Sequence, residues 1–398
     1  MAYSTDAVNA CLANYWKEKR SERILMWNGD PVWERLYSRL QAAKSVKDHG
    51  RQFSFDVTYG ASVRTTQGGT GGDINVGENG QTLAVGTDAR ALTHAAFAVQ
   101  EHDLTALNTP EQLSDFLVIQ LQTNGIQLQQ WLAETFLCGS AASNDPDLGF
   151  AGICSLNGGD ATPVSYTSAD GTSRHGIINL QPEADQITAA ITRHGISAGT
   201  VARWVSRFVD NSGGSWGADT QVEAADELHM LCCEGFSVFN QDGSMVTHNA
   251  PDLGLCTSRG YRRYAKWLRG NVRYAKGEDN GSDSNYSTRS GTGGGLLFGE
   301  KTPLYYCRTW DRAVTAGTAF VGYGGVLMFL NSKTWGVRYV NSAGANAGSN
   351  RQRGRVWRFR LMPERLEKDT RDFKGSAEQQ IFCHQINANG GMKGWDQA

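Results

Sequence analysis

The sequence predicts an α+β fold, in which helices and strands occupy separate stretches of the chain. Residues 53–59 alternate apolar and polar side chains, as a strand with one buried face does. Residues 109–137 place apolar side chains at helical spacing. Several further strand patterns lie between residues 299 and 366. Helix and strand signals are therefore both strong, and neither dominates the chain.

The composition is that of a folded protein rich in loops. The chain has 398 residues, 40% of them hydrophobic, which is enough for a core and suggests two or three domains. Glycine contributes 47 residues, about 12% against ~7% in ordinary proteins, whereas proline contributes only 8. The net charge of −2 disfavours a dedicated nucleic-acid-binding protein.

The first 50 residues predict a helical arm. Residues 4–20 place apolar side chains on one helical face. Residues 31–44 predict a second helix, because Asp30 suits the N-cap and Pro31 the first helical position. We expect an arm and not an independent domain.

An extended hairpin is predicted next. The apolar face of its first strand consists of Phe53, Phe55, Val57 and Tyr59. Glycine-rich sequence follows at 67–80, and strand patterns return in residues 81–107. Such a hairpin has too few apolar residues to fold alone, so it needs another surface to lie on.

The stretch at 109–137 predicts one long helix. Thr109 suits the cap, Pro110 suits the first position, and leucines follow in steps of four. Gly125 interrupts the helix and Gly139 ends it. At 1.5 Å per residue it is a rod of roughly 40 Å.

The remaining elements are shorter. Helices are predicted at Asp185–Gly195 and Val222–Phe236, and a strand or a helix at Val201–Val209. Strands are predicted within residues 149–155, 301–310, 319–340 and 353–366.

No motif predicts catalysis, a cofactor or a metal ion. The glycine clusters lack the pattern of a phosphate-binding loop, and neither a metalloprotease nor a nucleophile-elbow motif occurs. His229, Cys232 and Cys233 suit a reactive thiol or a metal pair, but a packed core helix is the favoured interpretation. The eight cysteines are irregularly spaced, which favours buried thiols over a disulfide framework.

Residues 256–276 combine basic and aromatic side chains. A contact between subunits is the favoured interpretation, ahead of a solvated helix face and of a surface for single-stranded nucleic acid. The basic residues are Arg259, Arg262, Arg263, Lys266, Arg269, Arg273 and Lys276, interleaved with Tyr261, Tyr264, Trp267 and Tyr274.

The order of these parts resembles the major capsid proteins of tailed bacteriophages, which share the Hong Kong 97-type fold. Gln52–Val99 resembles the E-loop of that family, and Thr109–Leu137 resembles its spine helix. "GFAGICS" (149–155) resembles the short strand after the spine, and "GEKTPLYYCRTWD" (299–311) a late strand leading out of the axial domain. Residues 319–340 resemble a strand pair near the end of the fold.

The resemblance implies a division of the chain and a role. It implies an N-terminal arm (1–50), an E-loop (51–106), a peripheral domain with the spine helix (107–148), an axial domain (149–318) and return strands (319–398). It implies pentamers and hexamers that form an icosahedral shell around double-stranded DNA, bound without sequence specificity. Scaffolding, portal and decoration proteins are implied partners. The protein would be made in the host bacterial cytoplasm and end in the virion, with no membrane involved.

Ten residues are the candidates for contacts between subunits. The E-loop candidates are Arg64, Gln67, Asp73, Asn75 and Glu78, and the others are Arg262, Arg263, Tyr264, Trp267 and Arg269. The chain shows neither a long charged helical segment before its first helix nor the residues that cross-link some family members. Two alternatives remain open: another phage structural or tail protein, and a carbohydrate-active hydrolase.

Overall fold

The computed structural model describes part of the chain, and the structural statements below concern that part alone. It covers residues 47–49, 52–58, 83–89, 91–100, 102–103, 112, 116, 120, 124, 136–137, 152–153, 165–167, 173–234, 238–239, 245–246, 251–271, 296–298, 302–315, 323–339, 358–361 and 370–397. The predicted helices at 4–20 and 31–44 and the glycine-rich stretch at 67–80 lie outside it.

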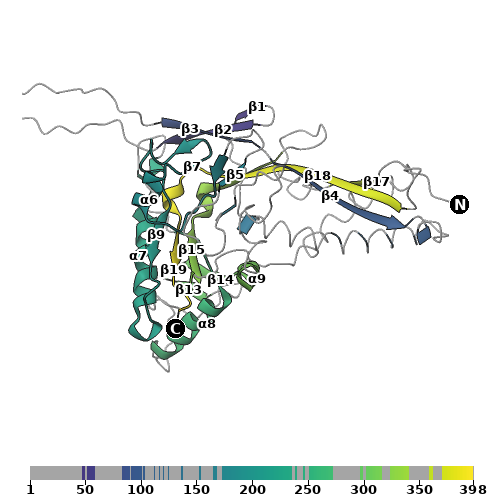
Figure 1. Cartoon of the computed structure of the whole chain (residues 1–398). Helices are drawn as coiled ribbons and strands as arrows, with labels where there is room; N and C mark the ends of the chain where they lie inside the picture. Colours follow the sequence, from purple (N-terminus) through teal and green to yellow (C-terminus); the bar gives the residue numbers. More distant parts are fainter. Residues whose placement is uncertain are drawn as a thin grey trace, which may run out of the picture.

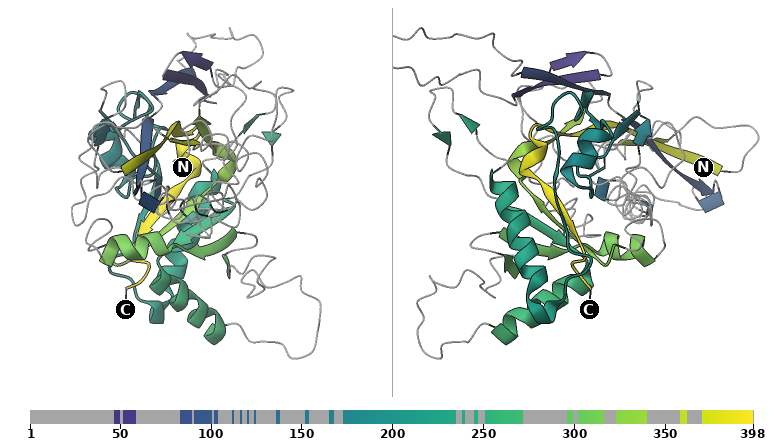
Figure 2. Two further views of the ribbon diagram at one scale, coloured as in Figure 1. Left: turned by 90° about the vertical axis from the view of Figure 1, so that its right-hand side faces the viewer. Right: turned by 60° about the vertical axis from the view of Figure 1, so that its left-hand side comes forward.

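The molecule combines an α/β body with a long strand ribbon, and the α+β prediction is confirmed. Figure 1 shows the body with helices α7 and α8, the ribbon of β4, β17 and β18 leading away from it, and the small sheet of β1, β2 and β3 across its top. The views in Figure 2 show the same separation of parts.

A six-stranded sheet forms the centre of the body. Its order is β13-β14-β12-β15-β19-β9, with parallel pairs β12–β14 and β19–β9 and antiparallel pairs elsewhere. All five residues of β15 are buried, which fits a central strand covered on both faces. The strands are β9 (Arg207–Asp210), β12 (Leu253–Cys256), β13 (Leu296–Phe298), β14 (Thr302–Tyr306), β15 (Val326–Leu330) and β19 (Gly390–Lys393).

Two helices share the core with this sheet. α7 (Thr220–Glu234) and α8 (Ser258–Asn271) contribute buried apolar side chains to one cluster with β12, β14, β15 and β19. Trp395 lies in this cluster, where its ring is 4.7 Å from Trp216 and 5.9 Å from Tyr264. A shorter helix of the body is α9 (Arg308–Thr315). The residues near the C-terminus are therefore part of the core.

The ribbon is built around one long strand. β18 (Thr370–Cys383) pairs with β4 (Ala91–Gln100) over ten residues on one side. On its other side it pairs with β17 (Arg358–Leu361) and β16 (Trp335–Tyr339). Phe97 and Phe373 stack across the ribbon with ring centroids 4.8 Å apart.

The base of the predicted hairpin is confirmed. β2 (Gln52–Thr58) pairs antiparallel with β3 (Leu83–Ala89), and β1 (Lys47–His49) pairs with the other edge of β2. Phe53, Phe55 and Val57 are buried, as the alternating pattern predicts.

Short elements complete the fold. Three small hairpins are β5 (Ser165–Thr167) with β6 (Ser173–His175), β7 (Thr192–Arg193) with β8 (Ile196–Ser197), and β10 (Val238–Phe239) with β11 (Met245–Val246). The short helices are α6 (Glu183–Thr188), η2 (Trp216–Ala218), η3 (Ser332–Thr334) and η5 (Ile386–Ala388).

The long helix is described only in part. The described residues of this stretch are helical, in agreement with the prediction: Gln112, Phe116, Gln120, Asn124 and 136–137. The rest of 109–137 lies outside the described residues. The helix predicted at 222–236 is confirmed by α7.

The helix predicted at Asp185–Gly195 is wrong beyond Thr188. Ala190, His194 and Gly195 adopt positive φ angles, which no continuing helix allows, and β7 and β8 form a tight hairpin there. For Val201–Val209, only the last residues form a strand, β9.

Three strand assignments also change. Ile153 lies in a bend and not in a strand. Its backbone connects the end of the long helix to the segment after β6, because its N–H donates to Phe136 O and its carbonyl accepts from Ile178 N. Residues 308–310 begin α9, in which Trp310 is buried. β15 and β16 are strands as predicted, but they belong to different sheets and do not pair with each other.

Candidate subunit interface

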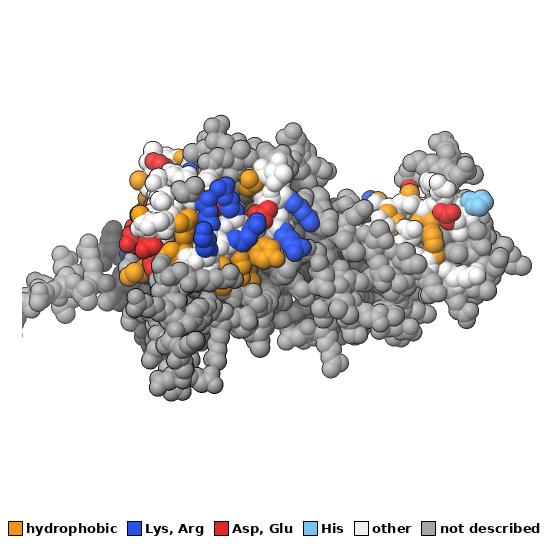
Figure 3. Space-filling model, turned by 90° about the horizontal axis from the view of Figure 1, so that it is seen from below, with side chains coloured by type: hydrophobic (Ala, Val, Ile, Leu, Met, Phe, Trp, Pro, Cys, Tyr) orange, Lys and Arg blue, Asp and Glu red, His pale blue; other side chains and the backbone are white. Residues whose placement is uncertain are grey.

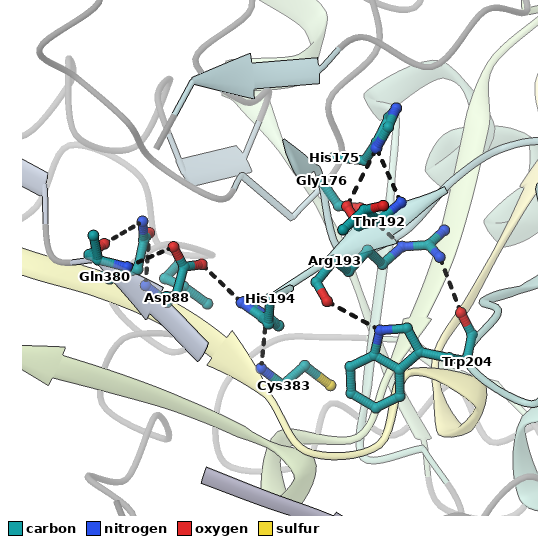
Figure 4. Close-up of polar contacts among 11 residues, drawn as sticks. Asp88, His175, Gly176, Thr192, Arg193, His194, Trp204, Gln380 and Cys383 are labelled. Atoms are coloured by element: carbon teal, nitrogen blue, oxygen red, sulfur yellow. Dashed lines mark hydrogen bonds and ion pairs between the residues drawn. The ribbon is translucent and has the colours of Figure 1, made fainter. Parts of the chain in front are cut away.

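The base of the hairpin is bonded to the body through a backbone contact and a side-chain pair. Thr87 N donates to the carbonyl of His194 at 2.8 Å, joining β3 to the turn between β7 and β8. Beside this bond, Asp88 Oδ2 lies 2.9 Å from His194 Nδ1, and both side chains are buried (Figure 4). The hairpin is therefore held to the body where it begins.

The neighbours of His194 determine which ring nitrogen carries its proton. The backbone N–H of Cys383 in β18 donates to Nε2 at 3.3 Å, so Nε2 accepts and Nδ1–H donates to Asp88. Asp88 Oδ1 accepts from Ala89 N, and Gln380 Nε2 donates to the carbonyl of Ala89 at 3.2 Å. Three elements, β3, the β7–β8 turn and β18, meet in this one network.

Aromatic rings surround the same point. The Phe55 ring lies 5.4 Å from His194, 5.2 Å from Phe382 and 5.1 Å from His384. Burial lowers the pKa of His384, and the nearby His194 lowers it further, against a hydrogen bond to the Asp56 backbone that raises it. The hairpin base is thus packed as tightly as a protein core.

A buried arginine orders the β7–β8 hairpin that receives β3. Arg193 donates to the carbonyl of Gly176 at 3.1 Å, to the carbonyl of Trp204 at 3.1 Å and to Gln186 Oε1 at 2.8 Å. His175 Nδ1 lies 3.2 Å from both the N and the carbonyl O of Thr192. Burial and the nearby Arg193 lower the pKa of His175, against a hydrogen bond to the Thr192 backbone that raises it. The site that holds the hairpin is therefore rigid.

A basic surface lies at the opposite end of the body. We call it the α8–α9 face and define it by five exposed residues: Arg259, Arg262, Lys266, Arg308 and Arg312. The two helices are joined because Ser258 N donates to Asp311 Oδ1 at 3.0 Å. Seen from below in Figure 3, Lys and Arg side chains gather in the middle of the described surface, with acidic side chains at its left edge and also among the basic group.

The residues predicted for subunit contacts are placed differently from one another. Arg262 is exposed, whereas Arg263 donates to the backbone carbonyls of Asp396 and Gln397. Burial and the nearby Arg259 lower the pKa of Arg263, against Asp396, which raises it. Trp267 is half-buried and donates to Asp219. The structure does not describe the Arg269 side chain or the E-loop candidates Arg64, Gln67, Asp73, Asn75 and Glu78.

Tyr264 corrects one of those predictions. Its side chain is completely buried, and its hydroxyl donates to the carbonyl of Leu297 at 3.0 Å. It therefore holds α8 to β13 and offers no surface to another subunit. The helical period explains the difference, because every third or fourth residue of α8 faces the core.

The sequence reasoning missed an acidic surface. We call it the α7 face and define it by Glu223, Glu227 and Met230, all exposed on α7. Arg308 and Arg312 of α9 were also not predicted as contact residues. Glu223 and Glu227 are four residues apart, and so are the two arginines. This spacing places like charges on one side of a helix and is visible in the sequence.

The structure favours a packed core for the His229 cluster. Cys232 is completely buried, and burial raises the pKa of its thiol. His229 Nε2 lies 2.9 Å from Thr302 Oγ1, and burial lowers the pKa of this imidazole. Among the described residues no group of His, Cys, Asp and Glu is arranged to hold a metal ion. Nor is any helix there long and apolar enough to cross a membrane.

The chain matches no protein-family model and no curated protein sequence. Solved structures to which it is similar include the capsid asymmetric unit of cyanophage A-1(L), with 12% identity, a TM-score of 0.49, and coverage of 92% of this chain and 93% of that chain. The capsid of an empty GTA particle has 11% identity and a TM-score of 0.47, with 90% and 88% covered.

The SrpI encapsulin complex from Synechococcus elongatus PCC 7942 has 10% identity and a TM-score of 0.40, with 77% of this chain and 75% of that chain covered. Because these likenesses are weak, the function is argued below from the geometry of this chain.

Proposed function

We propose that the protein is a major capsid protein with the Hong Kong 97-type fold, and that it assembles into the shell of a tailed bacteriophage. Hexamers and pentamers of this chain would form the icosahedral wall, which would enclose double-stranded DNA without reading its sequence. The role is structural and not catalytic. Scaffolding, portal and decoration proteins are proposed partners, and the host bacterial cytoplasm is the proposed place of synthesis.

The observation that carries the proposal is the strand ribbon. β4 uses one edge for ten consecutive pairs with β18, and among the described residues no strand pairs with its other edge. An open edge of this length is a template for pairing with another chain, and soluble monomers protect such edges. A ribbon that leads away from the body is suited to a subunit that neighbours will cover.

The hairpin supports the same proposal. Its base is fixed by the Asp88–His194 pair and by the packing of Phe55, so the direction in which it leaves the body is set. The sequence between its two strands is glycine-rich and has few apolar residues to bury. An arm with a fixed base and little core of its own suits an E-loop that lies on a neighbouring subunit.

The first test is negative-stain electron microscopy of the purified chain, with sedimentation velocity alongside. We expect closed shells, or rings of five and six subunits. A 43.4 kDa monomer that stays monomeric when crowding agents are added would overturn the proposal. Crowding is included because some shells need a scaffold to raise the local subunit concentration.

A deletion tests the hairpin directly. Removing Gln67–Asn79 should leave a folded subunit that cannot close shells, because the arm would no longer reach its neighbour. A matched variant replaces the same residues by a glycine–serine sequence of equal length, which separates the effect of length from that of sequence. Normal shells from the deletion variant would refute the E-loop assignment.

A further inference from the structure

We infer that the α7 face of one subunit binds the α8–α9 face of the next, so that subunits join head to tail around a ring. This inference rests on the proposed shell-forming function and names the surfaces through which a ring would close. The partner is a second copy of the same chain. Charge, apolar side chains and the separation of the two faces each support it.

The two faces lie on different sides of the body. α7 crosses the six-stranded sheet from its edge strand β9 over β19 and β15, and its His229 reaches Thr302 at the start of β14. α8 packs against β14, which lies next to the other edge strand, β13. In Figure 1, α7 runs along the left side of the body and α9 lies to the right of α8. A neighbour on each side could therefore be contacted at the same time.

Within the part of the chain that the structure describes, the α7 face carries negative charge without a basic partner. Glu223 and Glu227 are exposed and lie four residues apart, where like charges destabilise a helix. Among the described residues neither carboxylate forms an ion pair, and the nearest turn adds a third acid, Asp219, which is also exposed. This arrangement is unfavourable for an isolated subunit and favourable beside a positive surface.

The α8–α9 face has the opposite charge and the same spacing. Arg262 and Lys266 lie one helical turn apart on α8, and Arg308 and Arg312 lie one turn apart on α9. Among the described residues none of the four forms an ion pair with a carboxylate. The acidic group between the helices, Asp311, is half-buried and caps α8 through Ser258 N, so the exposed charge stays positive.

Each face also exposes large apolar side chains beside its charges. Met230 on α7 is 64% exposed, and on the other face Val314 is 38% and Tyr306 is 36% exposed. The Tyr306 ring is oriented by Tyr261, 5.4 Å away, and by Arg308 above it at 5.9 Å. A methionine against an aromatic ring is a favourable contact, and exposed apolar groups rimmed by charge are typical of protein interfaces.

The charges restrict the symmetry of the contact. A two-fold contact of either face with its own copy would bring like charges together. A reciprocal two-fold dimer would need both faces to meet the same neighbour, which two faces on different sides of the body do not allow. Pairing the acidic face with the basic face of the next subunit removes this repulsion. Such a head-to-tail contact leaves a free face at each end, and it is satisfied everywhere only when the chain of subunits closes into a ring.

Charge reversal tests the inference. One variant carries Glu223→Lys and Glu227→Lys. A second carries Arg262→Glu, Lys266→Glu, Arg308→Glu and Arg312→Glu, which leaves Arg259 as the one unchanged residue of the defined α8–α9 face. A third carries both sets of substitutions. All six positions are exposed, so folding should be preserved, and thermal unfolding checks this. Asp185→Lys on α6, an exposed acid outside both faces, is the matched control.

Sedimentation velocity and microscopy should show that the wild type and the control assemble and that each single-face reversal remains unassembled. The third variant, with both faces reversed, should assemble again, because its two faces remain complementary with their signs exchanged. Mixing the two separate reversals should give only rings with an even number of subunits, since the two variants must alternate, and five-membered rings should be absent.

The outcomes separate the inference from the proposed function. Normal shells from both single-face reversals would overturn the inference and leave the shell-forming function standing. Loss of assembly in the second variant without rescue in the third variant would also overturn it. A second variant that assembles normally but no longer retains DNA would assign the α8–α9 face to nucleic acid instead. A wild-type chain that never associates would refute the function itself.

Discussion

The Asp88 carboxylate and the His194 imidazole lie 106 positions apart in the sequence, yet Oδ2 and Nδ1 are separated by only 2.9 Å. Both side chains are essentially excluded from solvent, with exposed fractions of 0% and 1%. The contact connects β3 of the hairpin to the β7–β8 turn of the body, and through Cys383 N to β18. Several measurable consequences follow from this junction and from the core around it.

Replacing Asp88 by alanine should strongly destabilise the subunit. The substitution leaves the buried Ala89 N–H and the Nδ1–H of His194 without their acceptor, and removing one partner of a buried pair costs about 3–5 kcal/mol. Urea unfolding of the full chain measures the change. Asp56→Ala on the neighbouring strand, where the side chain is exposed, is the control and should change stability by less than about 0.5 kcal/mol. Equal effects of the two variants would contradict the role given to Asp88.

A methyl group at Gly86 should disrupt the hairpin base. A Cβ there would lie 2.6 Å from the Phe55 ring, inside the packed aromatic cluster. Overpacking of this kind costs about 1–3 kcal/mol, seen as a lower unfolding midpoint for Gly86→Ala. Gly213→Ala is the matched control, because a Cβ at Gly213 has no atom within 4 Å. An unchanged midpoint for Gly86→Ala would show that Phe55 moves aside without cost.

Stability of the unassembled chain should fall as the solution becomes acidic. Burial lowers the pKa of His175, His229 and His384 in the folded state. The unfolded chain therefore binds protons at these imidazoles more readily. Stability is fully present above the ordinary histidine pKa of about 6.5 and is lost as the pH falls through that value toward the lowered ones.

Urea midpoints measured between about pH 7.5 and about pH 5.5 test this expectation. His384→Gln should make the urea midpoint depend less steeply on pH, because it removes one of the three imidazoles while leaving a polar side chain in place. An unchanged pH dependence of the midpoint in this variant would show that His384 does not contribute to it. Midpoints that rise toward acid pH would contradict the expectation as a whole.

The described cysteines should differ sharply in reactivity. Burial raises the pKa of the Cys383 thiol to about 12 and that of Cys256 well above its usual value. Cys233 is only half-buried, so it should react fastest with iodoacetamide among the thiols that the structure describes. Peptide mass spectrometry after a short exposure measures this order, with a urea-unfolded sample as the control. Equal labelling of Cys383 and Cys233 would show that β18 opens readily.

Local patterns predicted the elements that have strong periodicity. The alternation at Phe53, Phe55 and Val57 identified β2, and the apolar run at 326–330 identified a fully buried strand. The helix predicted at 185–195 failed because the turn at Ala190 and His194 uses positive φ angles that the sequence does not announce. The prediction that residues 319–340 form a strand pair was wrong, because β15 and β16 belong to different sheets. Pairing between distant strands is set by tertiary packing and not by local pattern.

The candidate interface was predicted only in outline. The basic character of residues 259–266 was evident, but composition does not say which residues face outward. Tyr264 faces the core and Arg263 is used within the subunit, so Arg262 and Lys266 remain on the surface. The pairing of these residues with Glu223 and Glu227 requires knowing where α7, α8 and α9 lie around the body, which is tertiary information.

β18 has a mechanical consequence for any assembly that contains it. Its first ten residues pair with β4, and its last residues lie in the packed junction with Phe55 and His194, so one continuous strand runs from the junction to the far end of the ribbon. At about 3.4 Å per residue the paired stretch is a lever about 34 Å long. A tilt of about 5° at the junction therefore moves the far end by about 3 Å. Neighbouring copies in slightly different surroundings can reach the same contact through such a small rotation, without rearranging their cores.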